Sequence, residues 1–243
     1  MATLYLIPTP LGATPLDSVL PAETLRVTAR LKHFIVENAK TARAFLKQIG
    51  TALPLQQLDI VELNEHTPAA ALEALLAPLL AGHDVGLLSE AGCPAIADPG
   101  APLVRLAHQH GITVKPLVGP SSILLALMSS GLIGQRFAFH GYLPTKPEAR
   151  IAAIKDLEQR AARDDAAQVF IETPYRNDTI LKSLQSTCRP DTWCTIACNL
   201  TLASEWLHTF RIADIMNPLP DLNKLPCVFI LYRQGQSART HPH

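Results

Sequence analysis

The feature that most restricts the fold of this chain is a set of short, continuously apolar runs separated by segments with helical periodicity. Four such runs occupy the first half of the sequence, at residues 4–7, 33–36, 85–89 and 112–116. A strand that is apolar on both faces belongs in a parallel sheet covered by helices on both sides, because both of its faces are then buried. The sequence therefore predicts an α/β fold with a parallel sheet in its first half.

The helical segments carry start and stop signals. Thr67 followed by Pro68 predicts the start of a helix, and Gly82 predicts its end. Pro78 lies inside this segment and predicts a kink, because proline lacks the backbone N–H that a helix interior needs. Residues 102–110 predict a further helix, which a glycine ends.

A proline and glycine turn at residues 118–120 predicts a boundary between two domains, 1–118 and 119–233. The remaining residues, 234–243, are polar, and we expect them to be disordered. The pattern of the second domain is less regular than that of the first. It predicts helices at 147–163 and 177–184 and strands at 167–171, 193–198, 206–212 and 227–232.

Charge and cysteine content narrow the function and the cellular setting. The chain has 21 Lys and Arg residues and 21 Asp and Glu residues, so its formal charge is zero. Proteins that grip long stretches of nucleic acid carry an excess of basic residues, which this total does not show. Five cysteines without regular spacing, an amino terminus without a basic leader and the lack of a long apolar stretch predict a cytoplasmic protein with reduced thiols and no membrane span.

The region from residue 85 to 131 has the clearest signs of a ligand site. Its loop at 89–100, rich in small residues, follows a predicted parallel strand, and ligands of open α/β sheets bind at the carboxyl ends of strands. The turn at 119–122 places two serines where a helix begins, so that their hydroxyls and backbone N–H groups could hold a carboxylate or a hydroxyl. Serines at that position are also ordinary helix caps, and both interpretations stay open. The glycine fingerprints of dinucleotide and nucleoside-triphosphate sites are absent.

Other groups of polar residues offer less. Glu37 follows a strand at the same sheet edge, where it can serve a substrate or favour the start of the next helix. Cys194 and Cys198 face one side of a predicted strand and are interpreted as core thiols rather than zinc ligands. His108 and His110 suit the negative end of a helix dipole better than a metal site. We therefore predict no metal.

Residues 89–100 resemble the S-D-A-G-T-P-G-I-S-D-P-G signature of the tetrapyrrole methylase superfamily. The resemblance is closest to its branch of bacterial small-subunit ribosomal RNA cytidine 2′-O-methyltransferases. It continues through four further segments, so that it covers nearly the whole chain in the right order. These segments are residues 4–12, 116–122, 137–144 and 172–176.

The resemblance implies two α/β domains of the tetrapyrrole methylase type, with a parallel sheet in the first, a mixed sheet in the second and a cofactor cleft between them. It implies a homodimer, S-adenosylmethionine as the methyl donor and ribosomal RNA as a possible partner. Glu37 is the candidate base that takes a proton from a ribose hydroxyl. The residues that the resemblance assigns to the donor are Glu90, Ala91, Gly92, Ile96, Ala97, Ser121, Ser122, Pro174, Tyr175, Asn199, Leu200 and Thr201.

The chain also departs from the pattern. Glu90 stands where the family signature has aspartate, and Cys93 where it has threonine. The family segment E-D-T-R is replaced by Glu37-Asn38-Ala39-Lys40, and the family segment R-E-L-T-K is replaced by C-N-L-T-L at residues 198–202. The chain also ends soon after its last predicted strand, without the carboxyl-terminal helical region of the ribosomal enzymes. Three functions remain open: methylation of ribosomal RNA, methylation of another RNA or a small molecule, and an inactive binding module of the same fold.

Overall fold

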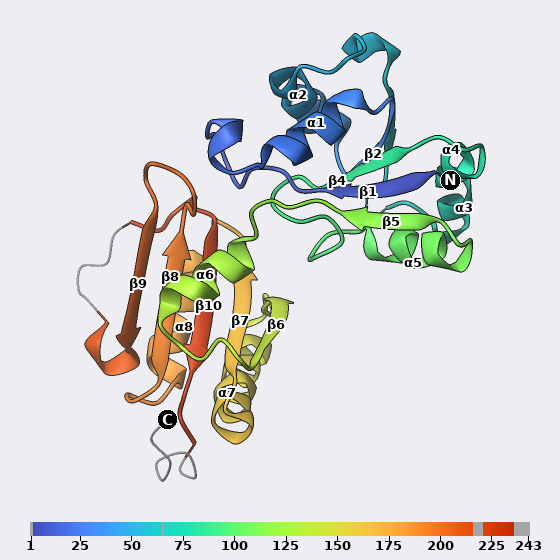
Figure 1. Ribbon diagram of the computed structural model, residues 1–243. Helices are drawn as coiled ribbons and strands as arrows, with labels where there is room; N and C mark the ends of the chain where they lie inside the picture. Colours follow the sequence, from blue (N-terminus) through green and yellow to red (C-terminus); the bar gives the residue numbers. More distant parts are fainter. Residues whose placement is uncertain (1, 65, 216–220, 236–243) are drawn as a thin grey trace. The chain divides into compact units, whose positions relative to one another are not determined.

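The computed structural model describes residues 2–64, 66–215 and 221–235. The chain forms two compact units, the first ending at Ser121 and the second beginning at Ser122 (Figure 1). The boundary expected after residue 118 lies just before this division and stays a prediction. Of the tail for which disorder was predicted, residues 236–243 lie outside the described residues.

The first unit contains a fully parallel sheet, as the apolar runs predict. Its strand order is β3-β2-β4-β1-β5, and every pair of neighbours is parallel. The four predicted strands are present, and the sequence missed β3 because this edge strand begins with Asp59, ends with Glu62 and is largely exposed. The strands are β1 (Thr3–Ile7), β2 (His33–Val36), β3 (Asp59–Glu62), β4 (Val85–Leu88) and β5 (Thr113–Pro116).

Helices cover both faces of this sheet (Figure 1). Tyr5 and Ile7 belong to a core under α1 and α2, whereas Leu4 belongs to a second core under α3 and α5. Alternate residues of β1 thus enter different cores, which is why the interior strands β1, β2 and β4 are largely apolar. The elements are α1 (Ala22–Arg30), α2 (Ala39–Ile49), α3 (Leu72–Leu75), α4 (Ala77–Leu80) and α5 (Ala101–Gln109), with 3-10 turns η1 (Leu16–Ser18), η2 (Leu55–Gln57) and η3 (Ala69–Ala71).

The single kinked helix predicted between Thr67 and Gly82 is wrong. The segment is broken into η3, α3 and α4, and Pro78 lies in the first turn of α4 rather than in a helix interior. Thr67 is not the N-cap of α3, which is Ala71, and its Oγ1 accepts a hydrogen bond from the backbone N–H of Asn64, 3.0 Å away. Proline is tolerated in a first turn, where its missing N–H has no partner to lose, so the chain starts a new helix there.

The second unit contains a mixed sheet with the order β6-β7-β10-β8-β9. β6 and β7 are parallel, whereas β10 is antiparallel to both β7 and β8. β6, β7 and β8 therefore run in one direction, and their carboxyl ends share one edge of the sheet. The predicted strand 206–212 ends one residue early, because Ile212 begins a 3-10 turn. The strands are β6 (Phe137–Tyr142), β7 (Ala167–Glu172), β8 (Trp193–Cys198), β9 (Trp206–Arg211) and β10 (Cys227–Tyr232).

Helix α6 (Ser122–Ser130) lies on one face of this sheet, and α7 (Pro147–Asp164) and α8 (Asn177–Thr187) lie on the other (Figure 1). The core under α7 and α8 includes Phe170 and Phe229, whose rings stack with centroids 5.3 Å apart. Cys194 and Cys198 are fully buried in this core, which confirms the prediction that they are core thiols. The packed core gives the loops at the sheet edge a rigid base.

Candidate functional site

The loop after β4 is tied to the loop after β1. The backbone N–H of Gly92 donates to the carbonyl of Thr9 at 3.0 Å, and the N–H of Thr9 donates back to the carbonyl of Gly92 at 2.9 Å. The hydroxyl of Ser89 donates to the same Gly92 carbonyl at 2.6 Å. Both loops leave the carboxyl ends of neighbouring parallel strands, which is the edge where the sequence predicts a ligand.

The backbone of this loop adopts left-handed conformations at three small residues. The φ angle is 79° at Gly92, 66° at Ala95 and 58° at Ala97. An alanine in this region costs about 1–2 kcal/mol more than in an ordinary conformation. The family signature has glycine at the position of Ala95, so this chain bears a strain that the signature avoids. Strained backbone of this kind is concentrated at ligand sites, and Ile96 between the two alanines is half-exposed.

Three carboxyl groups gather at this sheet edge. The pKa of Asp98 is raised from 3.8 to about 7, chiefly by burial and also by the negative charges of Glu37 and Glu90 and by a hydrogen bond with the Glu37 side chain. That hydrogen bond requires one of the two groups to keep its proton. Glu90 in turn accepts a hydrogen bond from the hydroxyl of Thr41 at 3.1 Å. The cluster makes this edge favourable for a ligand that carries positive charge.

Residues next to Glu37 satisfy the start of α2 without the Glu37 carboxyl group. Asn38 caps α2, because its Oδ1 accepts from the N–H groups of Lys40 at 2.9 Å and Thr41 at 3.2 Å. Glu62 Oε1 accepts from the N–H of Ala39 at 2.8 Å. The start of α2 is therefore satisfied without Glu37, which leaves the Glu37 carboxyl group to face Asp98.

The second predicted turn lies against the loop after β1. A Cβ added to Gly119 would lie 2.4 Å from Cβ of Pro8, so only glycine fits. The hydroxyl of Thr24 donates to the carbonyl of Val118 at 2.7 Å, which fixes the turn from α1. Beyond it, α6 begins at Ser122, as the sequence predicts.

The site residues expected in the second unit lie at one edge of its sheet. Pro174 and Tyr175 follow β7, and Asn199, Leu200 and Thr201 follow β8, which runs in the same direction. Tyr175 is 77% exposed. Sequence and topology together therefore bring two separate segments of the chain to one edge.

The loop after β8 is tightly folded and holds an unused hydroxyl. Its φ angles are 50° at Asn199 and 72° at Thr201, both left-handed. The Nδ2 of Asn199 donates to the hydroxyl of Ser204 at 3.0 Å, and Glu205 accepts from the N–H of Thr201 at 2.7 Å. Within the described residues, the buried Oγ1 of Thr201 has no hydrogen-bond partner. A buried polar atom without a partner is costly, and a ligand would satisfy it.

These features fit S-adenosylmethionine. Its sulfonium and ammonium groups suit the carboxyl cluster, and the small residues around Gly92 let the backbone approach a ligand closely. No local sequence pattern marks Asp98 as a site residue, although it lies inside the loop at 89–100 that resembles the family signature. Its spacing from Glu37 along the chain gives no sign that their side chains meet. Among the described residues, no group of three or more His, Cys, Asp or Glu side chains is arranged to hold a metal ion.

Comparison with known proteins decides the family. The family model described as Tetrapyrrole (Corrin/Porphyrin) Methylases matches residues 3–215. The chain belongs to the tetrapyrrole methylase family. The chain is an S-adenosylmethionine-dependent methyltransferase, and the resemblance found in its signature loop is confirmed.

Two relatives of this methylase are named Ribosomal RNA small subunit methyltransferase I. The relative from Escherichia coli O157:H7 is 28% identical over 97% of this chain and 79% of its own length. The relative from Streptococcus pyogenes serotype M3 is 32% identical over 94% of this chain and 76% of its own length.

Two solved structures share the fold of this methylase. The methyltransferase CobJ has a TM-score of 0.63 at 16% identity and covers 96% of this chain and 95% of its own. The uroporphyrin-III-C-methyltransferase from Thermus thermophilus has a TM-score of 0.55 at 19% identity, covering 95% and 92%. At these identities the likeness establishes the fold alone. Within the described residues, no helix of this methylase has the length and apolar character needed to cross a membrane.

Proposed function

We propose that this methylase transfers a methyl group from S-adenosylmethionine to a ribose 2′-oxygen of small-subunit ribosomal RNA. The observation that carries the proposal is the similarity to the two ribosomal RNA methyltransferases, which extends over at least 94% of the chain. The carboxyl cluster at the edge of the first sheet supports it, because a hydroxyl acceptor must lose a proton.

We assign the following roles to the residues of the chain. The loop at 90–97 and the turn that contains Ser121 and Ser122 hold the donor, and Pro174, Tyr175 and the loop at 199–201 contribute from the second unit. Glu37 accepts the proton of the ribose hydroxyl. S-adenosylmethionine supplies an electrophilic methyl group on a sulfonium, and alignment of such reactants is worth about 7–11 kcal/mol.

The Asp98 carboxyl group controls the basicity of Glu37 in this mechanism. Below pH of about 7, Asp98 keeps its proton and can donate a hydrogen bond to Glu37, which stabilises the Glu37 carboxylate and makes it a weaker base. Above that pH, Asp98 ionises and its negative charge makes Glu37 a stronger base. The rate of methyl transfer should therefore rise with pH through neutrality.

A direct experiment tests the acceptor. Purified protein is incubated with S-adenosylmethionine that carries a labelled methyl group and with 30S ribosomal subunits or their isolated RNA. The Glu37→Gln variant should lose about 10²- to 10⁴-fold in rate, the usual contribution of a general base. A matched control is Glu73→Gln on α3, whose carboxylate pairs with His110 at 3.2 Å and should leave the rate unchanged. Equal rates for both variants would remove Glu37 from the mechanism.

A small molecule is the second candidate acceptor. The zero formal charge of the chain favours it, because phosphate contacts to a long RNA are made by basic residues. Binding of the donor without labelling of either RNA would support this candidate.

We further propose that the protein is a cytoplasmic homodimer. The family resemblance implies the dimer, and exposed apolar side chains on α6, of which Met128 is 78% exposed, are a surface that a second copy would cover. The cysteines are all free, which suits a reducing compartment. Light scattering of the purified protein should give twice the mass of one chain, and the mass of a single chain would refute the dimer.

A further inference from the structure

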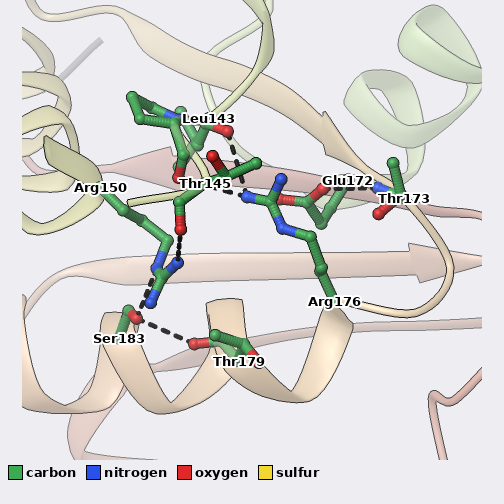
Figure 2. Close-up of polar contacts among 9 residues, drawn as sticks. Leu143, Thr145, Arg150, Glu172, Thr173, Arg176, Thr179 and Ser183 are labelled. Atoms are coloured by element: carbon green, nitrogen blue, oxygen red, sulfur yellow. Dashed lines mark hydrogen bonds and ion pairs between the residues drawn. The ribbon is translucent and has the colours of Figure 1, made fainter. Parts of the chain in front are cut away.

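Three consecutive carbonyl groups of the loop after β6 accept hydrogen bonds from two guanidinium groups (Figure 2). Arg176 donates to the carbonyls of Leu143 and Pro144, each at 3.2 Å. Arg150 donates to the carbonyl of Thr145 at 2.9 Å. Hydrogen bonds from charged donors are stronger than neutral ones, so this loop is held firmly at two points.

Arg176 owes its place to a buried carboxylate. Glu172 is the last residue of β7 and is 4% exposed. Its Oε1 accepts from the N–H of Thr173 at 2.6 Å, and its Oε2 lies 2.8 Å from Nη2 of Arg176. Within the described residues, that ion pair is the only polar contact of the buried Oε2 atom. A buried ion pair adds little stability over an apolar pair of similar size, so its stabilising effect alone does not account for it.

Tyr175 lies between the two ion-pair partners along the chain. Figure 2 shows Arg176 reaching from the loop after β7 to the carbonyl of Leu143 in the loop after β6. Their loop is held from its other side as well. The N–H of Lys224 donates to the carbonyl of Pro174 at 3.0 Å, and Nδ2 of Asn177 donates to the carbonyl of Leu222 at 2.7 Å. An exposed tyrosine thus stands on a loop that is fixed on both sides. Such an aromatic ring can stack on a purine base with little loss of conformational freedom.

We propose that the Glu172–Arg176 ion pair is a positioning device that fixes Tyr175 for contact with the adenosine part of S-adenosylmethionine. This inference rests on the proposed function, which assigns Tyr175 to the donor. Arg176 is a positioning residue, because it acts on the ligand through Tyr175 and the loop that bears it.

The test is calorimetric titration with S-adenosylhomocysteine, the demethylated product, which requires no methyl transfer. Arg176→Met should raise the Kd about three- to tenfold, the cost of immobilising a side chain and its loop on binding. Tyr175→Ala should raise the Kd as well. The double variant should bind no more weakly than Tyr175→Ala alone, because a positioning residue has no effect once the positioned ring is gone. Arg176→Lys, which keeps the charge without the planar fork, should recover part of the affinity.

Arg150 provides the matched control. It is buried, it grips the same loop, and its Nε donates to the hydroxyl of Ser183 at 3.0 Å. Arg150→Met should lower the melting temperature while leaving the Kd unchanged. Arg176→Met leaves the buried Glu172 carboxylate without its partner, which can prevent folding. In that case the double variant Glu172→Gln, Arg176→Met is measured instead, because it removes both buried charges.

The outcomes separate this inference from the proposed function. Failure of the wild-type protein to bind S-adenosylhomocysteine would overturn the donor site and the inference together. Binding by the wild type that Arg176→Met leaves unchanged would overturn only the inference. Additive losses in the double variant would also overturn it, since Arg176 would then act independently of Tyr175.

Discussion

Replacement of Gly119 by alanine tests the packing of the turn after β5 in the most direct way. The new Cβ would lie 2.4 Å from Cβ and 2.8 Å from Cγ of Pro8, and 3.1 Å from Cδ2 of Leu20. The ring of Pro8 is rigid and buried, so it cannot rotate away. Overpacking of this kind costs about 1–3 kcal/mol.

In a protein of this size that cost lowers the melting temperature by about 2 to 12 °C. Differential scanning calorimetry measures the change, with Gly134→Ala as the matched control. No atom lies within 4 Å of the Cβ position at Gly134, so this variant should keep its melting temperature within about 2 °C. Equal melting temperatures for Gly119→Ala and the wild type would refute the close contact between the turn and Pro8.

Three further predictions concern the carboxyl edge of the first sheet. Ala95→Gly should raise the unfolding free energy by up to about 1 kcal/mol, because relief of the left-handed backbone at alanine outweighs the added conformational freedom of the unfolded chain. Urea denaturation measures the change, and a lower unfolding free energy would contradict the backbone strain at Ala95. The pKa of Asp98 is raised in the folded protein from 3.8 to about 7, so the stabilisation by its proton is complete below pH 3.8 and is lost as pH rises to about 7. Asp98→Asn should therefore remove part of the fall in stability across that window, and unchanged pH dependence in urea titrations would contradict the raised pKa. In single-turnover assays of methyl transfer, Asp98→Asn should also abolish the rise in rate through neutrality, and a persisting rise would remove Asp98 from control of Glu37.

Local patterns predicted much of the fold. The apolar runs of β1, β2 and β4 lie in the sheet interior, where both faces are buried, and they gave a correct parallel sheet. The sequence pattern did not predict β3, because an edge strand needs fewer apolar side chains than an interior strand. The helix between Thr67 and Gly82 was wrong because several start and stop signals compete within a short segment.

The candidate site was predictable where it depends on backbone shape and hidden where it depends on distant contacts. The loop at 89–100 can be identified from its glycine and proline content, and its place at the end of a strand follows from the fold class. The pairing of Asp98 with Glu37 and the grip of Arg176 on Leu143 join residues that are far apart in sequence. Such contacts depend on how loops pack together, which no local pattern reveals.

The measurement that tests the central claim most directly is mass spectrometry of nucleosides from small-subunit ribosomal RNA. The RNA is first incubated with this methylase and S-adenosylmethionine labelled in its methyl group. We expect one labelled 2′-O-methylated nucleoside, and we expect it to be absent with Glu37→Gln. The contrary result is that the RNA stays unlabelled, both in 30S subunits and as free RNA, although the protein still binds S-adenosylhomocysteine. That result would contradict ribosomal RNA as the acceptor.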